Sequence, residues 1–145
     1  HGNAQTNSAR IRTHVATQEA FGEILRTVCA QRGWELLPSG VNVTHANGRH
    51  QVVMFEHFEN AGHHLIRLVS MIGVSGEMRR ERLIQALRAN ASLAHGALAL
   101  NGDELCMTDT LSLEDSDPSE IEFAVAYLAG MADYYEQVLF GTDHH

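Results

Sequence analysis

The chain of 145 residues has no lysine, only two cysteines and no long run of apolar residues. A helix that crosses a membrane needs about 18 consecutive apolar residues, and no stretch of this sequence approaches that length. The sequence also does not open with the charged, then apolar, then small-residue order of a signal peptide. We therefore predict a cytoplasmic location.

The two cysteines, Cys29 and Cys106, lie within apolar patterns and do not form a CxxC motif. A free cysteine behaves as a small buried hydrophobe, and disulfides are rare in reducing compartments. We therefore predict two buried thiols rather than a disulfide or a redox site.

The charge of the chain is unevenly distributed. All ten basic residues are arginines within residues 1–100, which carry seven acidic residues, whereas residues 101–145 carry eleven acidic residues and no arginine. An acidic surface of this kind repels phosphate groups. The net charge of −8 therefore argues against nucleic acid and anionic membranes as partners.

Motifs of nucleophilic and phosphate-binding enzymes are absent as well. There is no Gly-x-Ser-x-Gly nucleophile elbow, and neither cysteine lies in a motif that marks an activated nucleophile. The segment Gly73-Val74-Ser75-Gly76 lacks the Gly-Lys ending of a P-loop and the dinucleotide-binding pattern. We predict that the protein is not an enzyme and needs no cofactor.

The sequence does contain a clear succession of periodic segments. Apolar residues recur with helical spacing from Phe21 to Cys29, and Asn47-Gly48 favours a hairpin turn. Asp117, Pro118 and Glu120 provide the N-cap, the first position and the third position of a helix start. We predict helices at 17–32, 77–91 and 118–140, and strands near 41–46, 49–58, 63–73, 97–100 and 104–113.

This order predicts an α+β fold. It corresponds to α-β-β-β-α-β-β-α, with an antiparallel sheet of about five strands and three helices. Residues 17–141 are expected to form a single domain. Residues 1–16 are polar and aperiodic, so we interpret them as a disordered or tag-derived arm, and residues 142–145 as a tail.

Histidines near the hairpin turns raise the question of a metal site. If the first turn holds two residues, His45 faces His50; if the second turn, at 59–62, holds four, His57 faces His64. A closed zinc site takes four ligands, and no spacing provides a third and a fourth. We predict no metal site, with a regulatory domain that senses a metal or small ligand through His57 and His64 as the alternative.

Both faces of the predicted sheet are apolar, so either helices cover both or a second chain covers one. The more continuously apolar face is expected to lie under helices 17–32 and 118–140, and it carries Val41, Val43, Val52, Met54, Phe58, Leu65, Val69 and Met71, with Glu56 and Arg67 as an ion pair. The opposite face carries Asn42, Thr44, Gln51, Val53, Phe55, Ile66, Leu68, Ser70 and Ile72, and it has the apolar centre and polar rim of an interaction surface. The predicted partner-binding residues are Phe21, Val53, Phe55, Ile66 and Leu68.

The last predicted helix carries a second apolar line. Phe123, Tyr127, Gly130 and Tyr134 follow one another at helical spacing, separate from the core-facing residues. Aromatic residues are favoured at protein interfaces. The line is either the margin of a wide core face or a contact with a subunit or client.

The segment Leu83-Ile84-Gln85-Ala86-Leu87-Arg88-Ala89-Asn90 resembles the LLxxLLxAN signature of type III secretion chaperones, that is, the Tir chaperone (CesT-like) group and their YbjN-like relatives. The segments 96–100 and 105–111 are similar to the two strands that follow it in that family. The resemblance implies an acidic homodimer that binds an extended segment of a partner along helix 17–32 and the sheet. It also places helix 77–91 in the dimer contact, for which the candidate residues are Leu83, Leu87, Phe123, Tyr127 and Tyr134.

The combined prediction is a chaperone-like protein-binding module whose partner is another polypeptide, which the resemblance extends to a secreted client. The regulatory domain named above is the first alternative. A structural subunit of an assembly is a third possibility that the sequence leaves open.

Overall fold

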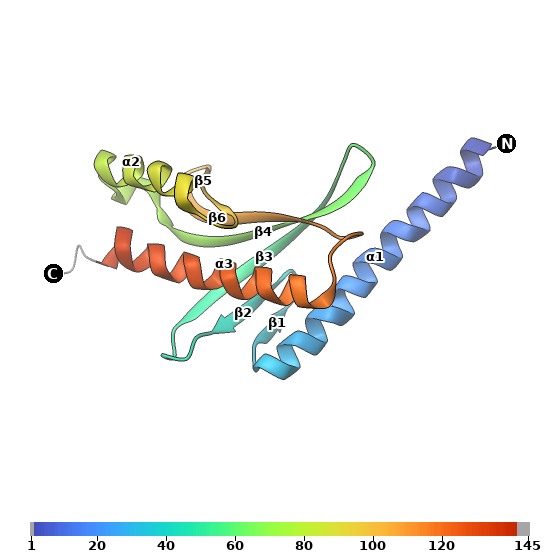
Figure 1. The fold of residues 1–145 in the computed structure, drawn as a ribbon, viewed down its shortest axis with the longest axis horizontal. Coiled ribbons are helices and arrows are strands. Elements are labelled where there is room, and N and C mark those ends of the chain that lie inside the picture. The colour runs from blue at the N-terminus through green and yellow to red at the C-terminus, as the bar shows by residue number, and fades with distance from the viewer. Residues whose placement is uncertain (1, 142–145) are drawn as a thin grey trace.

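A computed structural model describes the backbone of residues 2–141 and the side chains from residue 17 onward. Figure 1 shows a sheet with helices packed against it. The elements are α1 (Gly2–Arg32), β1 (Glu35–Leu37), β2 (Gly40–Thr44), β3 (His50–Asn60), β4 (His63–Val74), η1 (Ser75–Glu77), α2 (Arg80–Ala89), η2 (Asn90–Ser92), β5 (Ala97–Asn101), β6 (Glu104–Ser112) and α3 (Pro118–Leu139).

The structure confirms the predicted α+β class and the order of its elements. All strand pairs are antiparallel, and the sheet has six strands in the order β1-β2-β3-β4-β6-β5. The strand that the sequence did not predict is β1, a short segment that pairs with β2 through Leu36 and Val41. Because β1 and β5 each have one strand neighbour, they form the two edges of the sheet.

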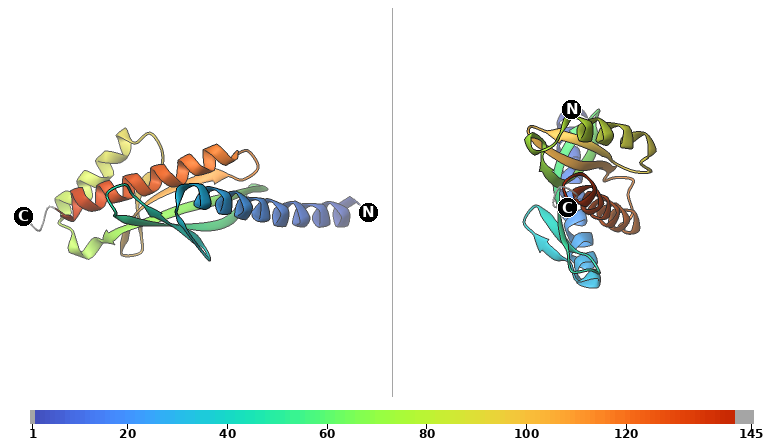
Figure 2. Two further views of the ribbon diagram at one scale, coloured as in Figure 1. Left: turned by 90° about the horizontal axis from the view of Figure 1, so that it is seen from below. Right: turned by 90° about the vertical axis from the view of Figure 1, so that its left-hand side faces the viewer.

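The first helix starts earlier than expected. α1 begins at Gly2, whereas apolar periodicity predicts a helix from residue 17. The additional turns carry α1 past the body of the domain as one continuous helix (Figure 2). The division of the chain at residue 16 stays a prediction, and the predicted tail at 142–145 lies outside the described residues.

α3 begins at the predicted N-cap. The side chain of Asp117 accepts a hydrogen bond from the backbone N–H of Glu120 at 2.8 Å and another from the Ser119 hydroxyl at 2.7 Å. These hydrogen bonds favour the charged carboxylate and lower the pKa of Asp117. The helix then buries one face against β3, β4 and β6, with Ile121, Val125, Leu128 and Ala132 in the core.

Two arginines, one in each neighbouring element, form ion pairs with α3. Arg49, in the β2–β3 hairpin, contacts Asp133 with 2.7 Å between Nε and Oδ1. Arg32, at the end of α1, contacts Glu122 with 2.7 Å between Nε and Oε2. The hairpin and α1 are therefore both held to the helix that covers the sheet.

Asn90, the last residue of the chaperone-like signature, links α2 to the sheet. Its side-chain amide donates a hydrogen bond to the carbonyl of Leu98 at 3.0 Å, and its side-chain oxygen accepts one from the N–H of Leu98 at 2.7 Å. The asparagine thus pairs with edge strand β5 much as a neighbouring strand would. These hydrogen bonds explain why an asparagine suits this position, which the spacing of apolar residues alone does not show.

Both long hairpin turns differ in length from the prediction. The N–H of His45 donates to the carbonyl of Arg49 at 2.8 Å, and the N–H of Gly48 donates to the carbonyl of His45 at 2.9 Å, so the first loop has three residues rather than two. The second loop has two residues rather than four, because Asn60 pairs directly with His63.

These turns set the strand register, and the register separates the predicted histidine pairs. His50 and His64 each pair with another residue, so neither His45–His50 nor His57–His64 is formed across the strands. In the first hairpin the observed register differs from the predicted one by one residue. The side chains of β2 therefore lie on the opposite face of the sheet, relative to those of β3, from the face predicted. The shift in the second hairpin is by two residues, which keeps the faces of β3 and β4 together.

The face predicted to bind a partner is the one that the helices cover, so the predicted assignment of the faces is wrong. Val53, Ile66 and Leu68 have no exposed surface, and Phe55 is half-buried against the same core. Val41, which the assumed turn placed on the other face, lies opposite Val53 and is fully buried with it.

The opposite face of β3 and β4, assigned to the core from the sequence, is open. Val52 and Met54 are 39% and 41% exposed. The expected ion pair between Arg67 and Glu56 is present at 3.6 Å, and the Arg67 guanidinium lies 4.3 Å from the centre of the Phe58 ring. Part of this apolar face is therefore shielded by an arginine side chain.

Internal hydrogen bonds explain why the more polar face is the inner one. The side-chain amide of Gln51 donates to the hydroxyl of Ser70 at 2.9 Å and to the carbonyl of Met71 at 2.8 Å. The hydroxyl of Ser70 in turn donates to the carbonyl of Val52 at 2.7 Å. Hydrogen bonds lower the cost of burying polar groups, so the Gln51 amide nitrogen and the Ser70 hydroxyl are accommodated in the core. The Gln51 Oε1 is buried without a hydrogen-bond partner among the described residues.

Candidate binding groove

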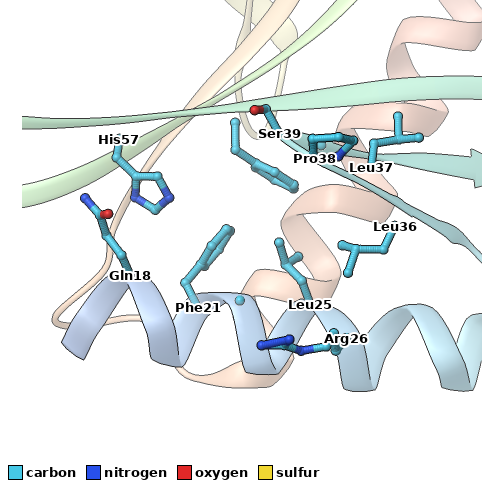
Figure 3. Close-up of a pocket in the computed structure, with 12 residues that line it drawn as sticks. Gln18, Phe21, Leu25, Arg26, Leu36, Leu37, Pro38, Ser39 and His57 are labelled. Atoms are coloured by element: carbon cyan, nitrogen blue, oxygen red, sulfur yellow. The ribbon is translucent and has the colours of Figure 1, made fainter. Parts of the chain in front are cut away.

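An open groove of about 320 Å³ separates α1 from the first strands of the sheet. Figure 3 shows its two sides, with Phe21, Leu25 and Arg26 projecting from α1 and Leu36 and Leu37 from β1. The full lining is Gln18, Phe21, Gly22, Leu25, Arg26, Leu36, Leu37, Pro38, Ser39, Gly40, Phe55 and His57.

Aromatic rings form the inner wall of the groove. The ring of Phe21 meets that of Phe55 edge to face, with 5.2 Å between the centroids, and the ring of His57 in the same manner at 5.6 Å. Phe21 and Leu25 are only 3% and 6% exposed and contribute little open surface, whereas the half-buried Phe55 extends the apolar wall. The wall is preformed because each ring is fixed by its neighbours.

The outer wall of the groove belongs to edge strand β1. Leu36 is 43% exposed, and its strand β1 pairs only with β2 in the described part of the chain. The turn Pro38-Ser39 closes the groove, and the carbonyl of Ser39 accepts a hydrogen bond from the N–H of Phe55 at 2.8 Å. An exposed leucine thus lies beside the free backbone edge of a sheet.

The structure brings together only part of the predicted partner-binding set. Phe21 and Phe55 both line the groove, whereas Val53, Ile66 and Leu68 lie beneath it in the core. The residues that sequence reasoning missed are those of β1 and its turn. Leu36-Leu37 followed by Pro38-Ser39 is an apolar pair before a turn, which is a weak signal for a short edge strand.

The residues predicted to contact a second subunit lie at the surface on two separate elements. On α2, Leu87 is 69% exposed and Leu83 is half-buried. On α3, Phe123 and Tyr134 are both 53% exposed, and Tyr127 is half-buried between them. The second apolar line of α3 is therefore outside the core.

Neither a metal centre nor a reactive thiol emerges from the described side chains. Among residues 17–141, no group of three or more His, Cys, Asp or Glu side chains lies close enough together to hold a metal ion. Cys29 and Cys106 are both buried and unpaired, and burial raises the pKa of each thiol, with Glu104 adding to the effect at Cys106. Such thiols are protonated and inaccessible, the opposite of an activated nucleophile.

Comparison with known proteins identifies the class of fold. The structure is similar to a chain of the HopA1–SchA chaperone–effector complex, with a TM-score of 0.56, 10% sequence identity, and coverage of 81% of this chain and 93% of that one. It is also similar to a chain in the crystal structure of the Yersinia pestis type III secretion chaperone SycH in complex with a stable fragment of YscM2, with a TM-score of 0.52, 16% identity, and coverage of 78% and 97%. The chain therefore has a chaperone-like fold.

The sequence comparisons add nothing to this assignment, since no protein-family model and no curated protein matches the chain. No helix in the described part of the chain is long and apolar enough to cross a membrane.

Proposed function

We propose that the protein holds another polypeptide, in the manner of a type III secretion chaperone. The observation that carries this proposal is the groove between α1 and β1, where an exposed Leu36 lies beside an unpaired sheet edge. The similarity to a chain of a chaperone–effector complex and to a chain in the structure of a type III secretion chaperone with a fragment of YscM2 supports it. The role needs no catalytic group.

Two kinds of contact act together in this groove. An extended segment of the partner adds to the free edge of β1, and its backbone hydrogen bonds give affinity with little sequence preference. One of its apolar side chains enters the groove against Phe21, Leu25 and Phe55. Burial of an apolar side chain contributes about 1.5–3 kcal/mol, so the partner is expected to carry a large apolar residue at this point.

The change Leu36→Asp is expected to weaken binding of such a segment at least about tenfold, because it replaces an apolar wall by a charge that the complex would bury. The measurement uses peptides selected from a displayed library of short random sequences, with affinities determined by fluorescence anisotropy. Leu36 is 43% exposed, so the variant is expected to fold normally.

The matched control is Leu100→Asp. Leu100 is a 55% exposed leucine on β5, the opposite edge of the sheet, and it is expected to tolerate the change without loss of peptide affinity. An equal loss of affinity in both variants, or selected peptides that bind the Leu36→Asp variant as tightly as the unmodified protein, would contradict the proposal.

We further propose that the protein is a homodimer through α2, where Leu87 is 69% exposed beside Ile84, which is 37% exposed. Light scattering is expected to give about 32 kDa, twice the 16.0 kDa of one chain. Leu87→Glu is expected to yield the monomer, while Val74→Glu, at a 45% exposed position on β4, leaves the dimer intact. An unmodified protein that scatters as a monomer at micromolar concentration would refute this assembly.

A further inference from the structure

A second hollow, of about 310 Å³, lies between α3 and β6. It is formed by the first turns of α3, the second half of β6 and the loop before β5. Its lining is His95, Asp109, Leu111, Ser119, Glu120, Phe123, Ala124 and Tyr127. Neither the polypeptide-binding groove nor the homodimer contact on α2 uses this hollow.

Three aromatic rings form a corner in this hollow. Phe123 and Tyr127, one turn apart on α3, are stacked with 5.7 Å between their centroids and 26° between their planes. The ring of His95 stands nearly perpendicular to both, at 5.6 Å and 80° from Phe123 and at 5.4 Å and 87° from Tyr127. Ring faces carry partial negative charge, so a corner of rings attracts a cation.

The charged groups of the hollow point to the same kind of ligand. Asp109 and Glu120 both line it, and no arginine is among its lining residues in the described part of the chain. An anion is disfavoured, since the carboxylate of Asp117 already caps the N-terminal amides of α3 by accepting a hydrogen bond from the N–H of Glu120. Two carboxylates beside three rings, with no arginine in the described lining, favour a positive group as the complementary ligand.

We infer that this hollow binds an arginine side chain of the partner polypeptide. A guanidinium is planar, so it stacks on aromatic rings and at the same time donates hydrogen bonds to a carboxylate, which a lysine ammonium does less well. The inference rests on the proposed function only for the source of the arginine. The cation-binding chemistry of His95, Phe123, Tyr127 and the two carboxylates stands without it.

The test titrates the full chain with N-acetylarginine amide and follows backbone and ring resonances by NMR. We expect the largest shifts at His95, Phe123 and Tyr127, and weaker binding as salt is added. The matched ligand is N-acetylcitrulline amide, which has nearly the same shape and no charge, and it is expected to bind at least about fivefold more weakly.

Two variants separate the aromatic and the acidic contributions. Phe123→Leu is expected to weaken arginine binding about two- to fivefold, whereas Tyr134→Leu, at an equally exposed aromatic on the same helix but outside the hollow, leaves it unchanged. Asp109→Asn preserves the shape of the side chain and removes its charge, so it is also expected to weaken binding.

The inference is overturned if citrulline binds as tightly as arginine, if the shifts map away from the hollow, or if the Phe123 and Tyr134 variants behave alike. Failure here is distinguishable from failure of the proposed function. Leu36→Asp is expected to leave arginine binding unchanged, and Asp109→Asn is expected to leave the binding of apolar peptides at the α1–β1 groove unchanged.

Discussion

Replacing Leu68 by alanine is expected to lower the free energy of unfolding by about 2–5 kcal/mol, because a large side chain is removed from a close-packed core. Leu68 has no exposed surface and lies on the face of β4 that α3 covers. Met54→Ala, on the open face where the side chain is 41% exposed, is expected to cost less than about 1 kcal/mol.

Urea unfolding of the two variants, followed by circular dichroism, measures this difference directly. The two residues lie on neighbouring strands and face opposite sides of the sheet, so the comparison tests which face is the core. A larger loss for Met54→Ala than for Leu68→Ala would show that the helices cover the other face. It would also restore Val53, Ile66 and Leu68 as surface candidates for partner binding.

The second large effect is expected at Gly96, which lies in the chain between His95 and the first residue of β5. Its φ of +71° is a conformation that costs a residue with a side chain about 1–3 kcal/mol. An added Cβ would lie 2.8 Å from the backbone oxygen of Thr108, which belongs to strand β6 and cannot move aside easily. Gly96→Ala is therefore expected to destabilise the protein strongly.

Gly102→Ala provides the control for the backbone conformation alone. Gly102 has a φ of +61° in the β5–β6 turn, and an added Cβ there would meet nothing within 4 Å. Thermal unfolding is expected to show a clearly lower midpoint temperature for Gly96→Ala than for Gly102→Ala. The reason is that overpacking at residue 96 lowers the free energy of unfolding by about a further 1–3 kcal/mol. Equal midpoints would mean that the segment before β5 adjusts freely, and His95 would then not be held in the aromatic corner.

Local sequence signals predicted most of the secondary structure. The N-cap at Asp117 and the apolar periodicity of α3 act within one helix, so they can be recognised without knowledge of the rest of the fold. The strands β3 to β6 follow from alternation and turn residues in the same way. The short strand β1 was missed because Glu35–Leu37 has no alternation long enough to count, and only its pairing with β2 makes it a strand.

The candidate groove could be predicted only in part. Phe21 lines the groove, as helical spacing on the apolar face of α1 allows, and its part in partner binding stays a prediction. Leu36 and the Pro38-Ser39 turn could not be placed there, because a groove between α1 and β1 depends on how two elements pack. The aromatic corner likewise needs His95 from one loop beside Phe123 and Tyr127 from α3.

The sequence by itself determined the class of fold, the order of elements, the net charge of −8 and the absence of lysine, because each of these depends on composition or on short-range periodicity. The tertiary structure alone decided which face of the sheet is the core. A one-residue difference in the β2–β3 turn moves Val41 to the side of Val53, and hydrogen bonds across strands allow Gln51 and Ser70 to be buried. Loop length and cross-strand pairing are relations between distant residues, so no local pattern contains them.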